Sequence, residues 1–201
     1  MKFIGITGGI GAGKSEIIHY MQKHYNCEVY LADEVAHEVQ RKGTECHQKL
    51  VQLLGGEILN ADGEIERKKM AEIIFNNPKL LKRVNALIHP AVQNYLLTHL
   101  ELARKSGMID LFVVEAALLI ETGYKDLVDE MWYVHADPDI RAERLRKSRG
   151  YSEQKIDQIM KSQLSEDAFR NACDFVIENN GDVCETFQQI DKKLEAYAWK
   201  E

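Results

Sequence analysis

Short apolar runs alternate with longer stretches of helical periodicity along this chain. Five runs have the length and composition of buried strands: residues 3–7, 27–31, 111–114, 131–134 and 175–177. Strands that alternate with helices in this way form a parallel sheet that has helices on both faces. The pattern therefore predicts an α/β fold of three layers around a five-stranded parallel sheet.

Helical patterns fill most of the remaining chain. The first covers residues 14–24 and carries on one face Ile17, Ile18 and Met21. The last follows a turn at residues 179–181 and carries on one side Val183, Phe187, Ile190 and Leu194. Residues 34–105 are mostly helical and long enough for a substrate-side subdomain. Turns or helix starts are expected within it at Gly55-Gly56, Asp62-Gly63, Pro78 and Pro90. Residues 139–170 are charged and helical in character.

Composition narrows the class of protein. A chain of 201 residues, 45% hydrophobic and 29% charged, suits one globular enzyme domain over residues 1–201. Its net charge of −6 argues against sequence-independent nucleic-acid binding, which needs a concentrated cationic surface. Glycines interrupt the first apolar run, which is therefore neither a signal sequence nor a membrane span. Four scattered cysteines without a Cys-x-x-Cys pair are typical of free thiols in a reducing compartment, so we expect a cytoplasmic protein.

Residues 8–15 carry the sharpest chemical signal. They match G-x-x-x-x-G-K-[ST] between a predicted strand and a predicted helix, and read Gly8, Gly9, Ile10, Gly11, Ala12, Gly13, Lys14, Ser15. The glycines let backbone N–H groups turn toward phosphate oxygens. Lys14 can reach the β- and γ-phosphates, and the hydroxyl of Ser15 is placed to bind Mg²⁺. A ligand-free turn leaves this lysine and serine unexplained, and a dinucleotide-binding loop needs glycine at position 14.

Two further features separate the classes of P-loop protein. The chain contains neither an Asn-Lys-x-Asp motif for guanine nor the Leu-Ser-Gly-Gly-Gln element of transport ATPases. It does contain an acid at the end of the second predicted strand, Asp33, and several arginines within residues 141–149. A carboxylate can deprotonate an acceptor hydroxyl, and arginines can neutralise a moving phosphoryl group. The pattern therefore favours a small-molecule kinase of the P-loop fold.

Several motifs carry a more specific resemblance. They are residues 4–15, Ala32-Asp33, Asp62-Gly63 with Arg67, residues 74–78, Asn85-Ala-Leu-Ile-His89-Pro90, Leu118-Leu-Ile-Glu121, Gln163 and residues 174–181. Over nearly its full length the chain resembles the dephospho-coenzyme A kinase family. The P-loop is generic, whereas the combination of the later motifs is far more specific.

The resemblance implies an activity and a set of site residues. The family transfers the γ-phosphoryl group of ATP, with Mg²⁺, to the ribose 3′-hydroxyl of dephospho-coenzyme A, the last step of coenzyme A biosynthesis. The catalytic residues implied are Asp33 as the activating acid, Lys14, and Arg144 in a mobile lid at about residues 139–170. The nucleotide-binding set is Gly8, Gly9, Gly11, Ala12, Gly13, Lys14, Ser15, Glu16, Asn180 and Gly181, with Ser15 on the metal. Residues 34–105 would bind the small-molecule substrate, with Arg67 and His89 near it, in a monomer or a small homo-oligomer.

Three departures from the family pattern matter. The family often has a second acid where this chain has Leu31, so the role of the base depends on Asp33 alone. A common Val-Pro is replaced by Ala116-Ala117, preceded by Glu115. A second lid arginine usually follows the first by four residues, where this chain has Ser148, which leaves Arg146 and Arg149 as substitutes.

Structural alternatives stand beside these roles. Asp33 could cap a helix beginning at Glu34, and the arginines could form a solvated helix face. His89 could be a structural histidine, and Glu115 could either hold Mg²⁺-bound water or cap a helix from Ala116 onward. Two other functions also remain open: a P-loop kinase for another nucleotide or small metabolite, and a nucleotide-dependent regulatory module without an acceptor.

Overall fold

The computed structural model describes residues 1–75 and 77–197. Asn76, within the family-like stretch 74–78, lies outside the described residues, as do residues 198–201 of the expected single domain. The chain divides into two compact units, one of residues 1–29 with 103–201 and the other of residues 30–102. The second unit nearly coincides with the helical segment expected at residues 34–105.

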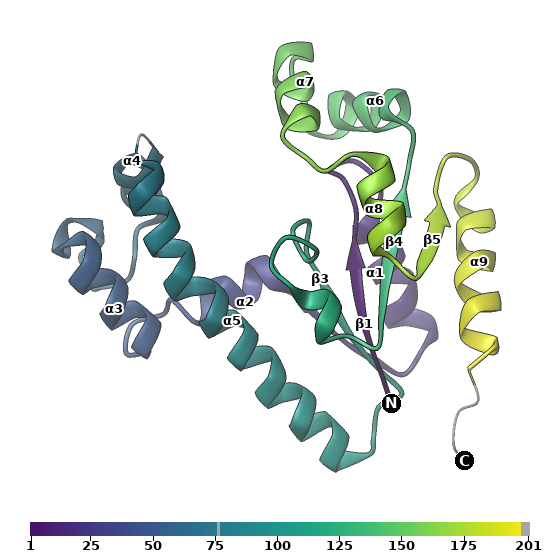
Figure 1. Ribbon diagram of the computed structural model, residues 1–201, viewed down its shortest axis with the longest axis horizontal. Helices are drawn as coiled ribbons and strands as arrows, with labels where there is room; N and C mark the ends of the chain where they lie inside the picture. The colour runs from purple at the N-terminus through teal and green to yellow at the C-terminus, as the bar shows by residue number, and fades with distance from the viewer. Residues whose placement is uncertain (76, 198–201) are drawn as a thin grey trace. The chain divides into compact units, whose positions relative to one another are not determined.

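The first unit is built on the predicted sheet, coloured from purple to yellow in Figure 1. The strands of the sheet are β1 (Lys2–Thr7), β2 (Cys27–Leu31), β3 (Leu111–Glu115), β4 (Glu130–His135) and β5 (Phe175–Glu178), in the order β2-β3-β1-β4-β5. The last two residues of β2 belong to the second unit. The central strand β1 pairs in parallel with β3 and with β4, and β4 pairs in parallel with β5. The five-stranded parallel sheet is confirmed, and β2 has the predicted bounds.

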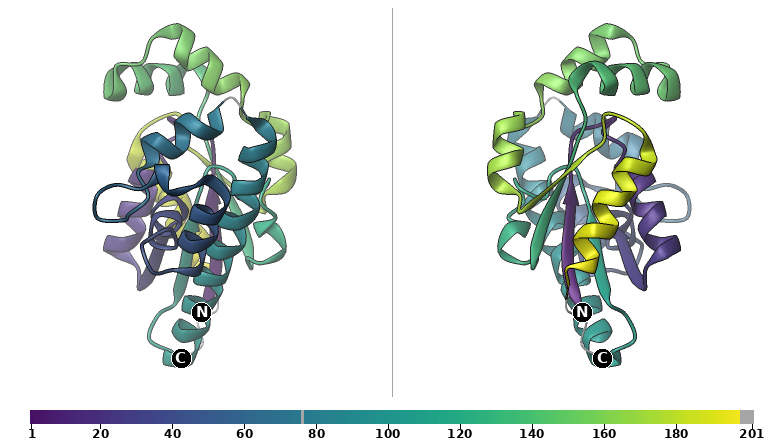
Figure 2. Two further views of the ribbon diagram at one scale, coloured as in Figure 1. Left: turned by 90° about the vertical axis from the view of Figure 1, so that its left-hand side faces the viewer. Right: turned by 90° about the vertical axis from the view of Figure 1, so that its right-hand side faces the viewer.

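Helices cover both faces of this sheet. Those of the first unit are α1 (Lys14–His24), α6 (Pro138–Arg149), α7 (Glu153–Lys161), α8 (Glu166–Ala172) and α9 (Val183–Glu195), with the short 3-10 helix η2 (Tyr124–Asp126). On one face Phe169 of α8 stacks on Tyr133 of β4 at 4.7 Å between ring centroids. On the other, α1 and α9 lie side by side, with Tyr20 stacked on Phe187 at 3.9 Å (Figure 2). The three layers are therefore confirmed.

The last helix differs from its predicted face at one position. Ile190 and Leu194 are buried as predicted, and α1 buries its three predicted residues. Val183, however, is 37% exposed, because it is the first residue of α9 and follows the capping side chain of Asp182. Thr186 takes the buried position in that first turn, and its hydroxyl is hydrogen-bonded to Asn179 at 3.0 Å.

The second unit is helical, as predicted. Its elements are α2 (Ala32–Glu38), α3 (Glu45–Leu54), the 3-10 helix η1 (Gly56–Ile58), α4 (Arg67–Phe75) and α5 (Pro78–Ser106), whose last residues belong to the first unit. Pro78 starts α5, but the expectation of a break at Pro90 is wrong, because α5 continues through it. Pro90 and the residue four positions earlier, Ala86, are both exposed, so water can satisfy the carbonyl that a proline leaves unbonded. Within residues 1–75 and 77–197, no helix has the length and apolarity that crossing a membrane requires.

Candidate active site

The loop of residues 8–13 joins the end of β1 to the start of α1. Gly8, Gly11 and Gly13 have φ angles of 149°, 81° and 99°, in the range that side chains with a Cβ rarely adopt. A Cβ on Gly8 would lie 2.5 Å from the carbonyl oxygen of Val134, so β4 packs directly against the loop. Gly13 starts α1 without a side-chain cap, and the first N–H groups of the helix therefore have no capping side chain. The loop thus has the backbone conformation of a phosphate cradle.

Lys14 directly follows this loop and is the first residue of α1. Its Nζ donates to the carbonyl of Gly8 at 2.8 Å and lies 3.5 Å from Oε1 of Glu115. The lysine side chain is 12% exposed and that of Glu115 20% exposed, which strengthens their attraction relative to a surface pair. Ser15 and Glu16 are exposed in the first turn of α1. The capping alternative for Glu115 is wrong, since residues 117–120 form a turn instead of a helix.

Arg144 and Asn179 hold the other end of the loop. The guanidinium of Arg144 donates to the carbonyl of Ala12 at 3.2 Å and to that of Asn179 at 2.9 Å. The buried carboxamide of Asn179 donates to the same carbonyl of Ala12 at 2.7 Å, and a Cβ on Gly13 would collide with it. The late Asn-Asn-Gly motif is thereby brought to the phosphate loop. Sequence reasoning had placed this motif near the nucleotide but had not identified the role of Asn179 in holding the loop.

Asn180 joins the ends of two strands. Its Oδ1 accepts from the backbone N–H of Asp137 at 2.7 Å, and its Nδ2 donates to the carboxylate of Asp137 at 3.2 Å. Gly181 follows in an exposed turn. Both residues are therefore next to Asn179, which contacts the loop, in the segment between β5 and α9.

The arginines of α6 point in two directions. Arg141 donates through Nε to the carbonyl of Ile10 at 2.9 Å and through Nη2 to Oε1 of Gln163. Burial lowers the pKa of Arg141. The guanidinium stays charged at neutral pH, because the usual pKa of arginine is far above it. Arg146 pairs with Glu153 at 2.6 Å, and Arg149 lies over the ring of Tyr151. The interpretation of all four arginines as one solvated face is therefore wrong.

Asp33 lies in a pocket of the second unit. It is the second residue of α2, whose N-cap position is Leu31, so the capping alternative is wrong. A pocket of about 410 Å³ is lined by Asp33, Ala36, His37, Gln40, Arg67, Met70, Ala71 and Ile74. The carboxylate of Asp33 is exposed, and Arg67, the first residue of α4, supplies a cation in the same pocket.

His37 is a pocket residue that sequence reasoning missed. It follows Asp33 by four positions, the spacing that brings two side chains to one helix face, and that spacing was the available signal. Burial and the charge of Arg67 lower the pKa of His37. At neutral pH the pocket therefore combines a neutral imidazole, a carboxylate and a guanidinium.

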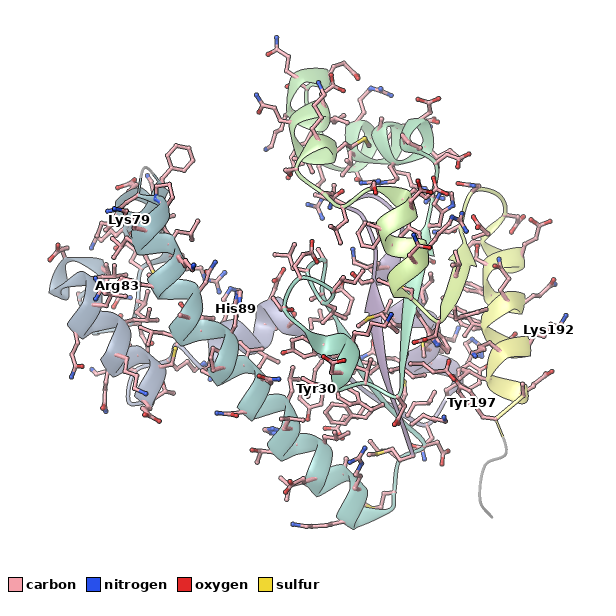
Figure 3. The ribbon with its side chains drawn as sticks, in the orientation of Figure 1. Tyr30, Lys79, Arg83, His89, Lys192 and Tyr197 are labelled. Atoms are coloured by element: carbon pink, nitrogen blue, oxygen red, sulfur yellow. The ribbon has the colours of Figure 1, made fainter. Side chains whose placement is uncertain are left out.

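His89 is not among the residues that line this pocket. It is exposed on α5, on the same helix as Arg83 and Lys79 (Figure 3).

Comparisons with known proteins agree on one family. The family model described as dephospho-CoA kinase matches residues 2–185. A dephospho-CoA kinase of Streptococcus mutans is 38% identical over 194 residues, 96% of each chain. One of Dehalococcoides mccartyi is 35% identical over 181 residues, 90% of this chain and 89% of the relative.

Solved structures give the same fold. The Thermus thermophilus protein TT1252 is 26% identical with a TM-score of 0.83, covering 99% of this chain and 98% of that one. A shikimate kinase of Bacteroides thetaiotaomicron, 14% identical, has a TM-score of 0.54 over 96% of both chains and supports the fold alone. Because the family model spans most of the chain and curated relatives match it almost end to end, the chain belongs to the dephospho-CoA kinase family.

Proposed function

We propose that this chain transfers the γ-phosphoryl group of ATP to the ribose 3′-hydroxyl of dephospho-CoA, giving CoA and ADP. The observation that carries the proposal is a complete phosphate loop in a chain that matches the dephospho-CoA kinase family over residues 2–185. ATP is the phosphoryl donor that a kinase of this family requires. Another acceptor is not favoured, because the curated relatives that match nearly the whole chain are dephospho-CoA kinases.

The phosphate loop provides the donor side of the site. Its backbone N–H groups bind the phosphates, and Lys14 moves from the carbonyl of Gly8 to the β- and γ-phosphates. Arg144, already against Ala12, adds positive charge at the loop. Asn180 and Gly181 contact the adenine end of the nucleotide. Residues 139–170, which include α6 and α7, act as a lid that excludes water during transfer.

The residues present also fit a magnesium ion. The exposed hydroxyl of Ser15 follows the phosphate-binding lysine, and Glu115 ends the neighbouring strand β3 beside that lysine. A hydroxyl, a nearby carboxylate and substrate phosphates are the oxygen donors that Mg²⁺ prefers. The ion would neutralise charge on the phosphates, with Ser15 as its protein ligand.

Asp33 is the residue proposed to activate the acceptor. Its carboxylate takes the proton of the 3′-hydroxyl, the hydroxyl oxygen bonds to the γ-phosphorus, and the bond from that phosphorus to the β,γ-bridging oxygen breaks, with its electrons leaving on ADP. The pocket that Asp33 shares with Arg67 can accept an anionic ligand that carries a hydroxyl. The helical unit, including His89, is proposed to bind the rest of dephospho-CoA. That Asp33 meets the triphosphate during turnover is part of the proposal.

The remaining partners follow from the same chemistry. The substrate is a small molecule, and the acidic net charge argues against a nucleic-acid partner. We propose a cytoplasmic enzyme that acts as a monomer or a small homo-oligomer without a membrane partner.

Acceptor-dependent ADP release tests the function directly. ADP formation should rise strongly with dephospho-CoA and only weakly with nucleoside monophosphates or shikimate, and mass spectrometry with NMR should place the new phosphate on the ribose 3′-oxygen. Stimulation by another acceptor, or phosphorylation at another position, would refute the proposed substrate. ATP binding without stimulation by any acceptor would favour the regulatory module.

A further inference from the structure

Two arginines of α6 reach the phosphate loop, and they contact different residues of it. Arg144 contacts the end of the loop through the carbonyl of Ala12. Arg141, one turn earlier on the same helix face, contacts the beginning of the loop through the carbonyl of Ile10. The two side chains are half-buried, whereas Arg146 and Arg149 are exposed.

The contacts of Arg141 place it against residues 8–10, where the ammonium group of Lys14 is also bound. The ammonium group of Lys14 donates to Gly8, and a Cβ on the next residue, Gly9, would collide with the guanidinium of Arg141. In a phosphate loop the lysine binds the β- and γ-phosphates. Arg141 therefore lies against the same first half of the loop as the ammonium group of Lys14, while Arg144 lies toward the start of α1.

Gln163, just after α7, fixes the direction of this guanidinium. Its Oε1 accepts from the backbone N–H of Ile10 at 3.3 Å and also from Arg141. Arg141 and Gln163 thus engage both the carbonyl and the N–H group of Ile10. Such a two-sided arrangement holds the planar guanidinium in one orientation, which a lysine could not reproduce.

We propose that Arg141 is the second arginine of the phosphoryl-transfer site and that Gln163 is its positioning residue. The guanidinium binds the γ-phosphoryl oxygens of ATP and stabilises the negative charge on them while that group moves to the acceptor. Neither Arg146 nor Arg149 takes this role, because Arg146 is paired with Glu153 and Arg149 lies over Tyr151 on the exposed side of the helix. This assignment rests on the proposed function and adds a residue to its site.

A purely structural role for Arg141 makes different predictions. If the guanidinium only tied the lid to the loop, its removal would weaken ATP and ADP binding alike. If it binds the γ-phosphoryl group, its removal should affect ATP and spare ADP. The ratio of the two affinities therefore separates the roles without depending on turnover.

The experiment compares Arg141→Ala with Lys147→Ala, which removes a cation from the exposed side of the same helix. Calorimetry with ADP and with a non-hydrolysable ATP analogue should show about tenfold weaker binding of the analogue to Arg141→Ala and unchanged binding of ADP. In acceptor-dependent ADP release, kcat should fall by on the order of 100-fold while KM for dephospho-CoA changes little. Lys147→Ala should match the unaltered protein in each measurement.

Further variants keep the test decisive. Arg141→Lys, which retains charge but not the planar fork, should lose turnover and retain ADP binding, and it replaces the alanine variant if that one does not fold. Equal loss of ATP-analogue and ADP affinity would overturn the proposal, as would near-normal turnover of either Arg141 variant or a larger loss in Arg146→Ala. If ADP release by the unaltered protein does not rise with dephospho-CoA, the proposed function is refuted. The ratio of the affinities for the ATP analogue and for ADP still decides the role of Arg141.

Discussion

The ammonium group of Lys14 lies 3.5 Å from the carboxylate of Glu115, which ends the neighbouring strand. The parallel register of β1 and β3 pairs Ile6 with Glu115, so the two strands end together where the phosphate loop begins. The relationship places an acid beside the lysine that must bind a triphosphate. Such an acid is useful only if its charge is compensated when the nucleotide arrives, and the proposed Mg²⁺ would supply that compensation.

Replacing Glu115 with glutamine tests this interpretation. Glu115→Gln should raise the Mg²⁺ concentration needed for half-maximal turnover and lower kcat about tenfold, because one charge that attracts the ion is lost. KM for dephospho-CoA should be unchanged. Magnesium titrations of ADP release provide the measurement, with the exposed Asp126→Asn as a charge-matched control. An unchanged magnesium dependence would show that Glu115 interacts with Lys14 and does not attract the ion.

Asp33→Asn should abolish most turnover while leaving the protein folded. The side chain is exposed and does not cap α2, so the free energy of unfolding should be unaffected. The loss of a general base lowers kcat by about 10²–10⁴-fold. ATP affinity, measured by calorimetry, should be unaltered.

The adjacent Glu34→Gln is the control for this substitution, because Glu34 is also exposed in the first turn of α2. It removes the same charge from the same helix and should keep near-normal turnover. Comparable activity of both variants would remove Asp33 from the role of base.

The fold could be predicted largely because its signals are local. The bounds of α1 and β2 agree with the prediction, since the phosphate-loop motif and short apolar runs mark them in the sequence itself. Pro90 was misjudged because α5 continues through it at an exposed position, where water can satisfy the carbonyl of Ala86 that the proline leaves unbonded. Val183 was misjudged because helical periodicity does not reveal how deeply a first turn is buried.

The candidate site could be predicted only where its residues are contiguous or match a family motif. The loop of residues 8–15 and Asp33 were proposed in this way, and the role of Asp33 stays a prediction. Arg141 was not, because its role depends on α6 returning to the loop across more than a hundred residues of chain, a contact that no local pattern records. The sequence singled out Arg144 and left Arg146 and Arg149 as candidates for the second arginine, whereas the partners in space favour Arg141.

Asn179→Ala should destabilise the protein as well as impair nucleotide binding. The buried carboxamide donates to Ala12 and is hydrogen-bonded to Thr186, and alanine leaves both partners without it. We expect a loss of about 2 kcal/mol in the free energy of unfolding. For a chain of this size that corresponds to a melting temperature lowered by about 4–8 °C.

Thermal unfolding and ATP calorimetry together check this expectation. Asn171→Ala, at an exposed position of α8, is the matched control and should leave both quantities unchanged. An Asn179→Ala protein with normal stability and normal ATP affinity would contradict the role assigned to this side chain in holding the loop.

Arg170 links two carboxylates, and this predicts how stability depends on acid pH. It donates to Glu166 at 2.7 Å and to Glu178 at 2.8 Å. The hydrogen bond from Arg170 is the main cause that lowers the pKa of Glu166. Burial raises the pKa of Glu178, but hydrogen bonds with Arg170 and His135 outweigh it, so this pKa too lies below its usual value.

Because both pKa values are lower in the folded protein than in the unfolded chain, folding favours the ionised carboxylates. Their contribution to the free energy of unfolding is complete above the usual glutamate pKa of about 4.3 and is lost as the pH falls below it. Arg170→Gln removes the partner, so unfolding by urea should depend less steeply on pH between about 5 and 3. Arg104→Gln, which removes the same charge from an exposed position near the end of α5, should retain the steep dependence of the unaltered protein. Parallel pH profiles for the two variants would mean that the carboxylates of Glu166 and Glu178 draw no stability from Arg170.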